Sequence, residues 1–315
     1  MSLRLFALVV CILASATASP AQTPGARDVE GTLIDELVVN GGPTGGPAFW
    51  TVADGDSKVF ILGVPGALPK GTQWATAKLE ARLKGANGLI LPPNVRASPF
   101  KAVAFFLTQR KSFQSPRPME ETLPPALRDR FVAARQQLGK KPARYAKWKP
   151  AVAGVLMAGD FRGAARVSLG EPQGKVRALA RAAGVREHRV ASYDAMPVLR
   201  QFTTLPDEAH RACLADTLTE VEAGAGRLQI AAQGWARGDV KAALTAERGY
   251  DRCLASAPAV GALIERGMAD TATAIAGAMG KPGKTVAVVE LRQLLARGGV
   301  LDRLRARGFR IETPE

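Results

Sequence analysis

The stretch VFILGVPGALPKGTQW, residues 59–74, decides the fold of this 315-residue chain. It begins with an apolar run typical of a short buried strand, continues through a Gly/Pro turn and ends in polar residues that open a helix. The preceding segment, Phe49–Ser57, reads FWTVADGDS, and its Asp-Gly-Asp is typical of a tight turn. The sequence therefore predicts a hairpin-like lead-in followed by a strand, a turn and a helix.

Outward from this stretch, strands are predicted near both ends of the chain. We expect them at the apolar or β-branched runs Gly88–Leu91, Ala102–Leu107, His188–Tyr193, Lys284–Val289 and Gly308–Glu312. Helical spacing of apolar residues predicts helices over Trp74–Lys84, Pro124–Leu138, Tyr145–Ala158 (interrupted by a proline), Val176–Ala183, Glu208–Glu222, Glu220–Ala232, Gly234–Leu244, Ala259–Met279 and Val300–Arg307. This order predicts an α/β fold: a central mixed β-sheet formed by N- and C-terminal strand segments, with a large helical insert.

The N-terminus has the pattern of an export signal. Arg4 precedes an apolar stretch from Leu5 to Leu13, and small residues around Ala16–Ala18 suit cleavage. The apolar run is shorter than the ~20 residues that span a bilayer. We expect a signal peptide over residues 1–21, a Gly/Pro-rich tether over 22–47 and a single domain over 48–315, without a transmembrane span in the mature chain. The predicted location is periplasmic or secreted.

Charge and cysteine content add two expectations. The formal net charge is +15, which favours anionic surfaces, whereas no nucleic-acid recognition motif accompanies the scattered basic residues. The expected partners are therefore an envelope polypeptide or an anionic polysaccharide, and not nucleic acid. Two cysteines follow the predicted leader, Cys213 and Cys253. In an oxidising compartment we expect them to form a disulfide, the alternative being two buried thiols.

The opening motif, FW-x-V-x-DGDS-x-V-x-x-LG-x-x-x-x-LP-x-G-x-x-W, resembles the start of the TraB/GumN family, which includes the Tiki proteases and is distantly similar to erythromycin esterase. The resemblance extends from about Phe49 to Glu312. Its later markers are Leu123-Pro124, Lys149-Pro150, FTTLP at Phe202–Pro206, WARGD at Trp235–Asp239, LIER at Leu263–Arg266 and the closing GGVLDRLRARGFRI at Gly298–Ile311.

The resemblance implies a cleft that holds a metal, and this sequence departs from it at the ligand positions. The family's first Gly-x-x-His corresponds to Gly63-Val64-Pro65-Gly66, so Gly66 stands where the histidine should be. Its acidic residue after the second strand corresponds to Pro92, and its second Gly-x-x-His corresponds to Glu290 through Gln293. A further family glutamate aligns loosely with Ser192 or Tyr193. Glu265 and Arg266 match the family's long helix.

These departures argue against the family's metal chemistry, because glycine has no side chain and glutamine is a poor ligand for zinc or manganese. The two histidines, His188 and His210, fall outside the motifs, and we expect both on the surface. No G-x-S-x-G elbow is present, and the glycines of Gly41–Gly46 suit a linker better than a phosphate loop. We expect no catalytic residue and no cofactor, with a divalent metal as the alternative.

Three functions follow from the sequence. The first is an exported, catalytically degenerate family member, a pseudoenzyme that binds an envelope polypeptide or anionic glycan in the former metal cleft. The second is a metal-dependent peptidase or hydrolase with a rebuilt ligand set, Glu265, Glu290 and Gln293. The third is a structural envelope protein with a filled cleft. Arg266 is expected either to hold an anionic group near Gly66 or to pair with a carboxylate such as Glu290.

Overall fold

The computed structural model describes residues 33–34 and 45–314. The predicted leader and most of the predicted tether lie outside the described residues. A mixed sheet of six strands has the order β10-β1-β2-β9-β4-β7. Its strands are β1 Phe49–Ala53, β2 Ser57–Val64, β4 Leu89–Leu91, β7 Glu187–Arg189, β9 Gly283–Glu290 and β10 Arg310–Glu312. As predicted, strands from the two ends of the domain meet in one sheet.

The segment 49–64 forms a hairpin and the first of the parallel strands at the centre of the sheet. β1 and β2 pair antiparallel across the predicted Asp-Gly-Asp turn, where the Ser57 Oγ donates to Asp56 Oδ1 at 3.1 Å. β2 pairs in parallel with β9 over its whole length, so that Val64 lies opposite Glu290. Apart from the partly buried Phe60, the apolar residues of these two strands are buried, as expected for parallel strands covered on both faces.

Helices fill the remainder of the domain. They are α1 Ala77–Leu83, α2 Pro99–Phe113, α3 Pro125–Gln137, α4 Pro150–Ala164, α5 Glu171–Ala182, α6 Met196–Thr203, α7 Asp207–Arg237, α8 Val240–Ala243, α9 Gly249–Leu254, α10 Pro258–Met279, α11 Leu291–Leu295 and α12 Val300–Ala306. Short 3-10 turns cover Met119–Thr122 and Pro142–Arg144. Two small sheets pair β3 Leu68–Pro69 with β6 Val167–Ser168, and β5 Asn94–Arg96 with β8 Ser192–Asp194.

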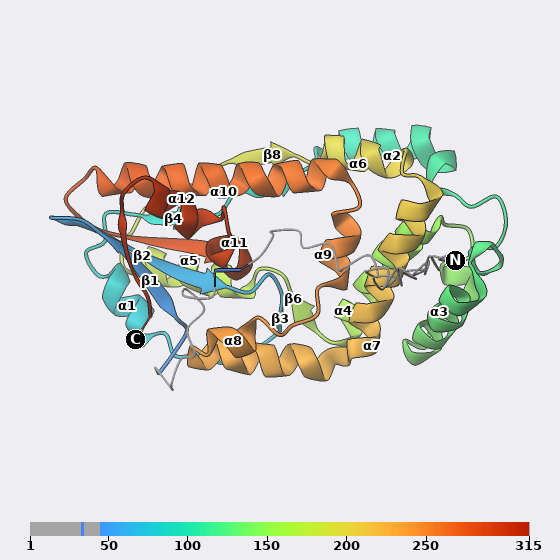
Figure 1. Ribbon diagram of the computed structural model, residues 1–315, viewed down its shortest axis with the longest axis horizontal. Helices are drawn as coiled ribbons and strands as arrows, with labels where there is room; N and C mark the ends of the chain where they lie inside the picture. The colour runs from blue at the N-terminus through green and yellow to red at the C-terminus, as the bar shows by residue number, and fades with distance from the viewer. Residues whose placement is uncertain (1–32, 35–44, 315) are drawn as a thin grey trace, which may run out of the picture.

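The molecule has a sheet end and a helical end. In Figure 1 the six-stranded sheet occupies the left half, α2, α3 and α4 lie at the right, and α10 runs along the top between the two ends. One apolar core surrounds the sheet, and two further clusters lie among the helices, around Phe131 and Tyr145 and around Phe113 and Phe202. No helix of the described residues is long and apolar enough to cross a membrane.

One predicted strand is wrong. Ala102–Leu107 lies inside α2, which begins with Pro99 at its first position, a favoured place for proline. The apolar run suggested burial on both faces, but Val103 and Leu107 are 59% and 74% exposed. The run is a helix with an apolar outer surface, which single-sequence periodicity does not distinguish from a buried strand.

The two overlapping helices predicted over residues 208–232 form one long element with a kink. Gly224 has φ 74° and ψ 171°, a conformation outside the helical region that favours glycine. Cys213 in α7 and Cys253 in α9 place their sulfur atoms at disulfide-bonding distance, in agreement with the predicted pair. The pair joins the two helices within the cluster around Phe113 and Phe202.

Candidate functional site

The turns after β2 and β9 lie side by side, because these parallel strands end at the same edge of the sheet. Gly66 follows β2, while Glu290 ends β9 and Gln293 lies in the first turn of α11. The Glu290 carboxylate caps α11, since its Oε2 accepts from the Gln293 backbone N–H at 2.9 Å. Gly66, Glu290 and Gln293 therefore lie in one region of the structure.

Tryptophans fix the first turn. The indole N–H of Trp235 donates to the Gly63 carbonyl at 2.8 Å, and Trp74 packs edge-on against Trp235 at 5.3 Å. A Cβ at Gly63 would lie 2.8 Å from the Trp50 ring and 2.6 Å from Leu291, so this position requires glycine. At Gly66 a Cβ would meet nothing within 4 Å. The markers Trp50, Trp74 and Trp235 thus hold the turn in place, while Gly66 faces open space.

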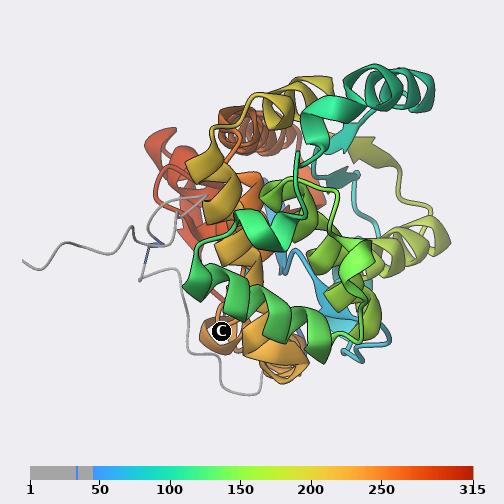
Figure 2. The ribbon, with the colours of Figure 1, turned by 90° about the vertical axis from the view of Figure 1, so that its right-hand side faces the viewer.

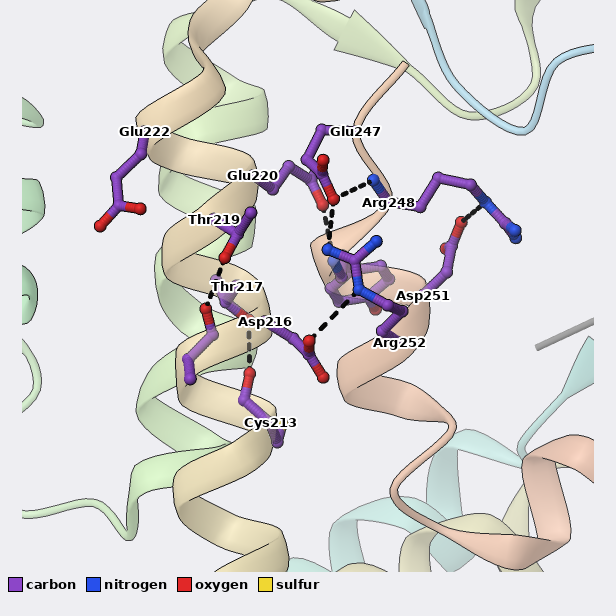
Figure 3. A network of polar contacts seen from close by, with 12 residues as sticks. Cys213, Asp216, Thr217, Thr219, Glu220, Glu222, Glu247, Arg248, Asp251 and Arg252 are labelled. Carbon is purple, nitrogen blue, oxygen red and sulfur yellow. Dashed lines mark hydrogen bonds and ion pairs between the residues drawn. The ribbon is translucent and has the colours of Figure 1, made fainter. Parts of the chain in front are cut away.

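A cavity of about 90 Å³ lies between this turn and the helical insert, and we call it the polar cavity after the charged residues among its lining. Gly66 and Glu290 line it from the sheet side. The opposite wall belongs to a charged cluster, which comprises Arg162, Asp216, Glu220, Glu247, Arg248, Asp251 and Arg252. Figure 3 shows most of this cluster, with acidic side chains of α7 facing residues on and just before α9.

Within the cluster every charge described here has an oppositely charged neighbour. Arg252 contacts Asp216 at 3.2 Å and also pairs with Glu247, while Arg248 pairs with Asp251 at 3.1 Å. Burial raises the pKa of Glu247, but hydrogen bonds from Arg252 and the Arg248 backbone outweigh it and lower that pKa overall. The cluster therefore holds its side chains in fixed positions at the cavity wall.

Glu220 is the most buried carboxylate of the cluster. Its Oε1 pairs with Arg162 at 3.1 Å, and its Oε2 accepts from the Tyr250 backbone N–H at 2.6 Å. Burial raises its pKa, and the guanidinium of Arg162 opposes this shift without cancelling it. The Arg162 guanidinium also lies 4.1 Å from the centre of the Tyr250 ring. Both carboxylate oxygens of Glu220 therefore already have a partner before any polar ligand enters this cavity.

A second cavity of about 380 Å³ adjoins the turn after β9 and is mainly apolar. Its lining comes from the β5 and β8 region, α6, α9, α10 and α11, and includes Pro92, Val95, Tyr193, Val198, Leu199, Leu254, Val260, Leu263, Ile264 and Gln293. Glu290 lines both cavities. The two cavities therefore meet at one carboxylate, with charged groups on one side and apolar groups on the other.

The candidate ligand set does not fit the metal implied by the resemblance. Gly66 has no donor, and Pro92 offers a carbonyl that already accepts from Arg189 at 2.8 Å. Glu265 pairs with Arg303 of α12 and lines neither cavity, so it does not join Glu290 and Gln293. Among residues 33–34 and 45–314, no three His, Cys, Asp or Glu side chains are grouped as a metal site requires.

Arg266 pairs with a carboxylate, which is one of the two alternatives expected, but the carboxylate is Asp270 rather than Glu290. Its guanidinium lies 3.6 Å from Asp270 one turn along α10, and 5.1 Å from the centre of the Tyr193 ring. The Tyr193 hydroxyl donates to Asp270 at 2.8 Å, and burial together with this bond raises the Tyr193 pKa to about 12. The expected pair with Glu290 is thus replaced by an Arg266–Asp270–Tyr193 group beside the apolar cavity.

The histidines lie apart from both cavities. His188 is exposed, as predicted, and lies on β7. The prediction for His210 is wrong, because this residue is only 1% exposed. His210 is in the first turn of α7, a helix that packs against α4, and neither ring nitrogen has a hydrogen-bond partner in the structure.

The charged cluster was missed by sequence reasoning. Its residues come from α4, α7 and the segment 247–252, which are distant in sequence, and each alone looks like an ordinary charged helix residue. The only available signal was the density of charge in Glu247–Arg252, ERGYDR. The charged cluster lies near the Gly63–Gly66 turn only because the helical insert folds back onto the sheet.

Comparison with known proteins agrees with the resemblance. No curated protein and no solved structure matches this chain. The model of the TraB/PrgY/gumN family matches residues 48–313, which is nearly all of the described domain. The match includes the hairpin, the first turn, the helical insert and the returning strands β9 and β10. This chain therefore belongs to the TraB/PrgY/gumN family.

Proposed function

We propose that this protein is an exported, catalytically degenerate member of its family that binds a polypeptide of the cell envelope in the former metal cleft. The observation that carries the proposal is the position of Glu290 in the wall of both cavities. A ligand lying across this carboxylate would place polar groups against the charged cluster and an apolar side chain in the apolar cavity. Mixed character of this kind is typical of a peptide.

The lining favours a polypeptide over an anionic glycan. Among the described residues, the polar cavity is lined by four carboxylates, Glu220, Glu247, Asp251 and Glu290, and by three guanidinium groups, Arg162, Arg248 and Arg292. Despite the overall charge of +15, the cleft itself is not a basic site that would attract a polyanion. The apolar cavity would also remain unused by a uronic acid chain. The presence of two cavities supports a binding role over a purely structural one.

Export and loss of metal chemistry rest on separate observations. The leader pattern of residues 1–21 and the Cys213–Cys253 pair both suit an oxidising compartment. Loss of metal chemistry is supported by the donor set, because Gly66 and Gln293 occupy the positions where the family has histidines. The rebuilt set of the hydrolase alternative would need Glu265, which is paired with Arg303 instead.

Binding can be tested with peptides released from an envelope fraction by trypsin. These peptides are passed over the immobilised mature protein, and polygalacturonate is titrated in parallel as a polyanion. We expect wild type to retain a subset of peptides with an apolar residue, and Leu263→Arg to lose them by filling the apolar cavity. The control Ile230→Arg changes an exposed residue on α7 outside both cavities and should retain them. Equal retention by Leu263→Arg, or saturable binding of polygalacturonate alone, would contradict the peptide assignment.

A further inference from the structure

Helix α2 presents large apolar side chains to solvent. Phe100, Val103, Phe106 and Leu107 are 85%, 59%, 51% and 74% exposed. Phe100, Val103 and Leu107 are spaced by three and four residues, so they lie on one face of the helix. Contiguous exposed apolar side chains of this size mark an interaction surface more often than chance exposure.

The opposite face of α2 packs against α6. Phe113, the last residue of α2, is 5% exposed, and within the helix its ring contacts those of Phe105 at 6.0 Å and Phe106 at 5.4 Å. Phe113 belongs to the cluster that also contains Phe202 of α6 and the disulfide cysteines. Figures 1 and 2 place α2 at the rim of the helical end, beside α6. Phe100, Val103 and Leu107 therefore lie on the face of α2 that the packing against α6 leaves exposed.

The stretch of chain that contains α2 carries charge of a single sign. Between Glu80 and Glu120 the sequence contains no Asp or Glu, and its basic residues are Arg82, Lys84, Arg96, Lys101, Arg110, Lys111 and Arg117. Lys101 lies near the start of α2, and Arg110 and Lys111 lie in its last turn. The nearest acidic residue along the neighbouring strand, Asp194, caps α6 through the Met196 N–H at 3.0 Å.

We propose that α2 docks this protein onto an anionic phospholipid surface. Phe100, Val103 and Leu107 would enter the boundary between headgroups and acyl chains, while Lys101, Arg110 and Lys111 contact lipid phosphates. Helices that lie in a membrane interface combine these two features. A second copy of the chain fits this face poorly, because it would bring together two basic helices on molecules that each carry +15.

Docking through α2 also sets the position of the cleft. α6, which packs beside α2, contributes Val198 and Leu199 to the apolar cavity. The apolar cavity would then lie near the bilayer, while the sheet end points away from it. The membrane contact itself does not depend on what the cleft binds, so it can be tested separately.

Vesicle sedimentation tests the proposal. The mature chain, without residues 1–21, is mixed with phosphatidylcholine vesicles and with vesicles that contain phosphatidylglycerol. We expect binding to the anionic vesicles only, and we expect Phe100→Ser/Leu107→Ser to weaken it about tenfold or more, since two large side chains no longer leave water. Lys101→Gln/Arg110→Gln/Lys111→Gln should lower binding and its salt dependence. The matched control Ile230→Ser removes an exposed apolar side chain on α7 and should bind like wild type.

The insertion of α2 can be followed directly. In Phe100→Trp the added indole should be quenched by brominated acyl chains more than the native tryptophans of wild type are. Equal sedimentation of wild type and Phe100→Ser/Leu107→Ser, or no sedimentation with anionic vesicles, would overturn the proposal. A dimer in light scattering that Phe100→Ser/Leu107→Ser abolishes, without vesicle binding, would overturn it in favour of self-association.

Discussion

At the scale of single residues, the two glycines of the first turn have opposite roles. A Cβ at Gly63 would clash with Leu291 and Trp50, both packed in the core, whereas a Cβ at Gly66 would meet only open space. We expect Gly63→Ala to lower the free energy of unfolding by roughly 1–3 kcal/mol, because inserting an atom into a packed core forces its neighbours apart. Gly66→Ala should leave it nearly unchanged. Urea denaturation of both variants measures the difference, and equal stability would show that the turn is not packed as described.

The buried His210 should make stability depend on pH. Burial is the main cause that lowers its pKa to about 4, and Lys149 lowers it further while Asp207 opposes this. Because the folded pKa lies below the unfolded value of about 6.5, the unfolded state binds the proton first as pH falls. The contribution of His210 to the free energy of unfolding is thus fully present above pH 6.5. It is lost between about pH 6.5 and 4, by on the order of 3 kcal/mol.

Substitution of each histidine tests this prediction. Unfolding of wild type, His210→Gln and the exposed control His188→Gln is compared at pH 7 and pH 4.5. The loss of stability on acidification should be smaller in His210→Gln than in the other two proteins. An identical loss in all three would show that His210 does not titrate on unfolding.

At the scale of elements, the Cys213–Cys253 bond joins α7 to α9 across a separation of 40 residues. By the loop-entropy argument, closing a loop of this length contributes about 4 kcal/mol to the free energy of unfolding. We expect a thiol reductant to lower the melting temperature of wild type, and to have no effect on Cys213→Ala/Cys253→Ala. A wild-type melting temperature that does not respond to reductant would mean that the bond is absent in the folded protein.

Elements with regular spacing of apolar residues, or with a turn motif at one end, were predictable from the sequence. The β1–β2 hairpin follows from the apolar run after Lys58 and the Asp-Gly-Asp turn before it, and α10 follows from its apolar spacing. Helix α2 was not predictable, because Ala102–Leu107 is apolar on every face. Whether such a run forms a buried strand or a helix depends on tertiary contacts. For the same reason the burial of His210 could not be predicted, since the helices that cover it are distant in sequence.

At the scale of the whole molecule, the sequence predicted one half of the candidate site. Gly63, Gly66, Glu290 and Gln293 lie at the ends of the adjacent parallel strands β2 and β9 or in the turns that follow them, and the family motif covers these positions. The other half, the charged cluster, belongs to the helical insert. Its position opposite Gly66 results from the packing of α7, α8 and α9 against one another and onto the sheet, which no local pattern encodes. The partner of Arg266 was also not predicted, and it is Asp270, one turn along the same helix.

The central claim is that the cleft persists while its metal chemistry is lost. Metal analysis of the purified mature protein, followed by titration with manganese, cobalt and zinc, tests it most directly, with Gly66→His/Gln293→His and Glu290→Ala as companions. We predict that wild type shows no stoichiometric binding, and that Gly66→His/Gln293→His gains affinity because the two positions follow neighbouring strands. Stoichiometric binding by wild type that Glu290→Ala abolishes would contradict the claim.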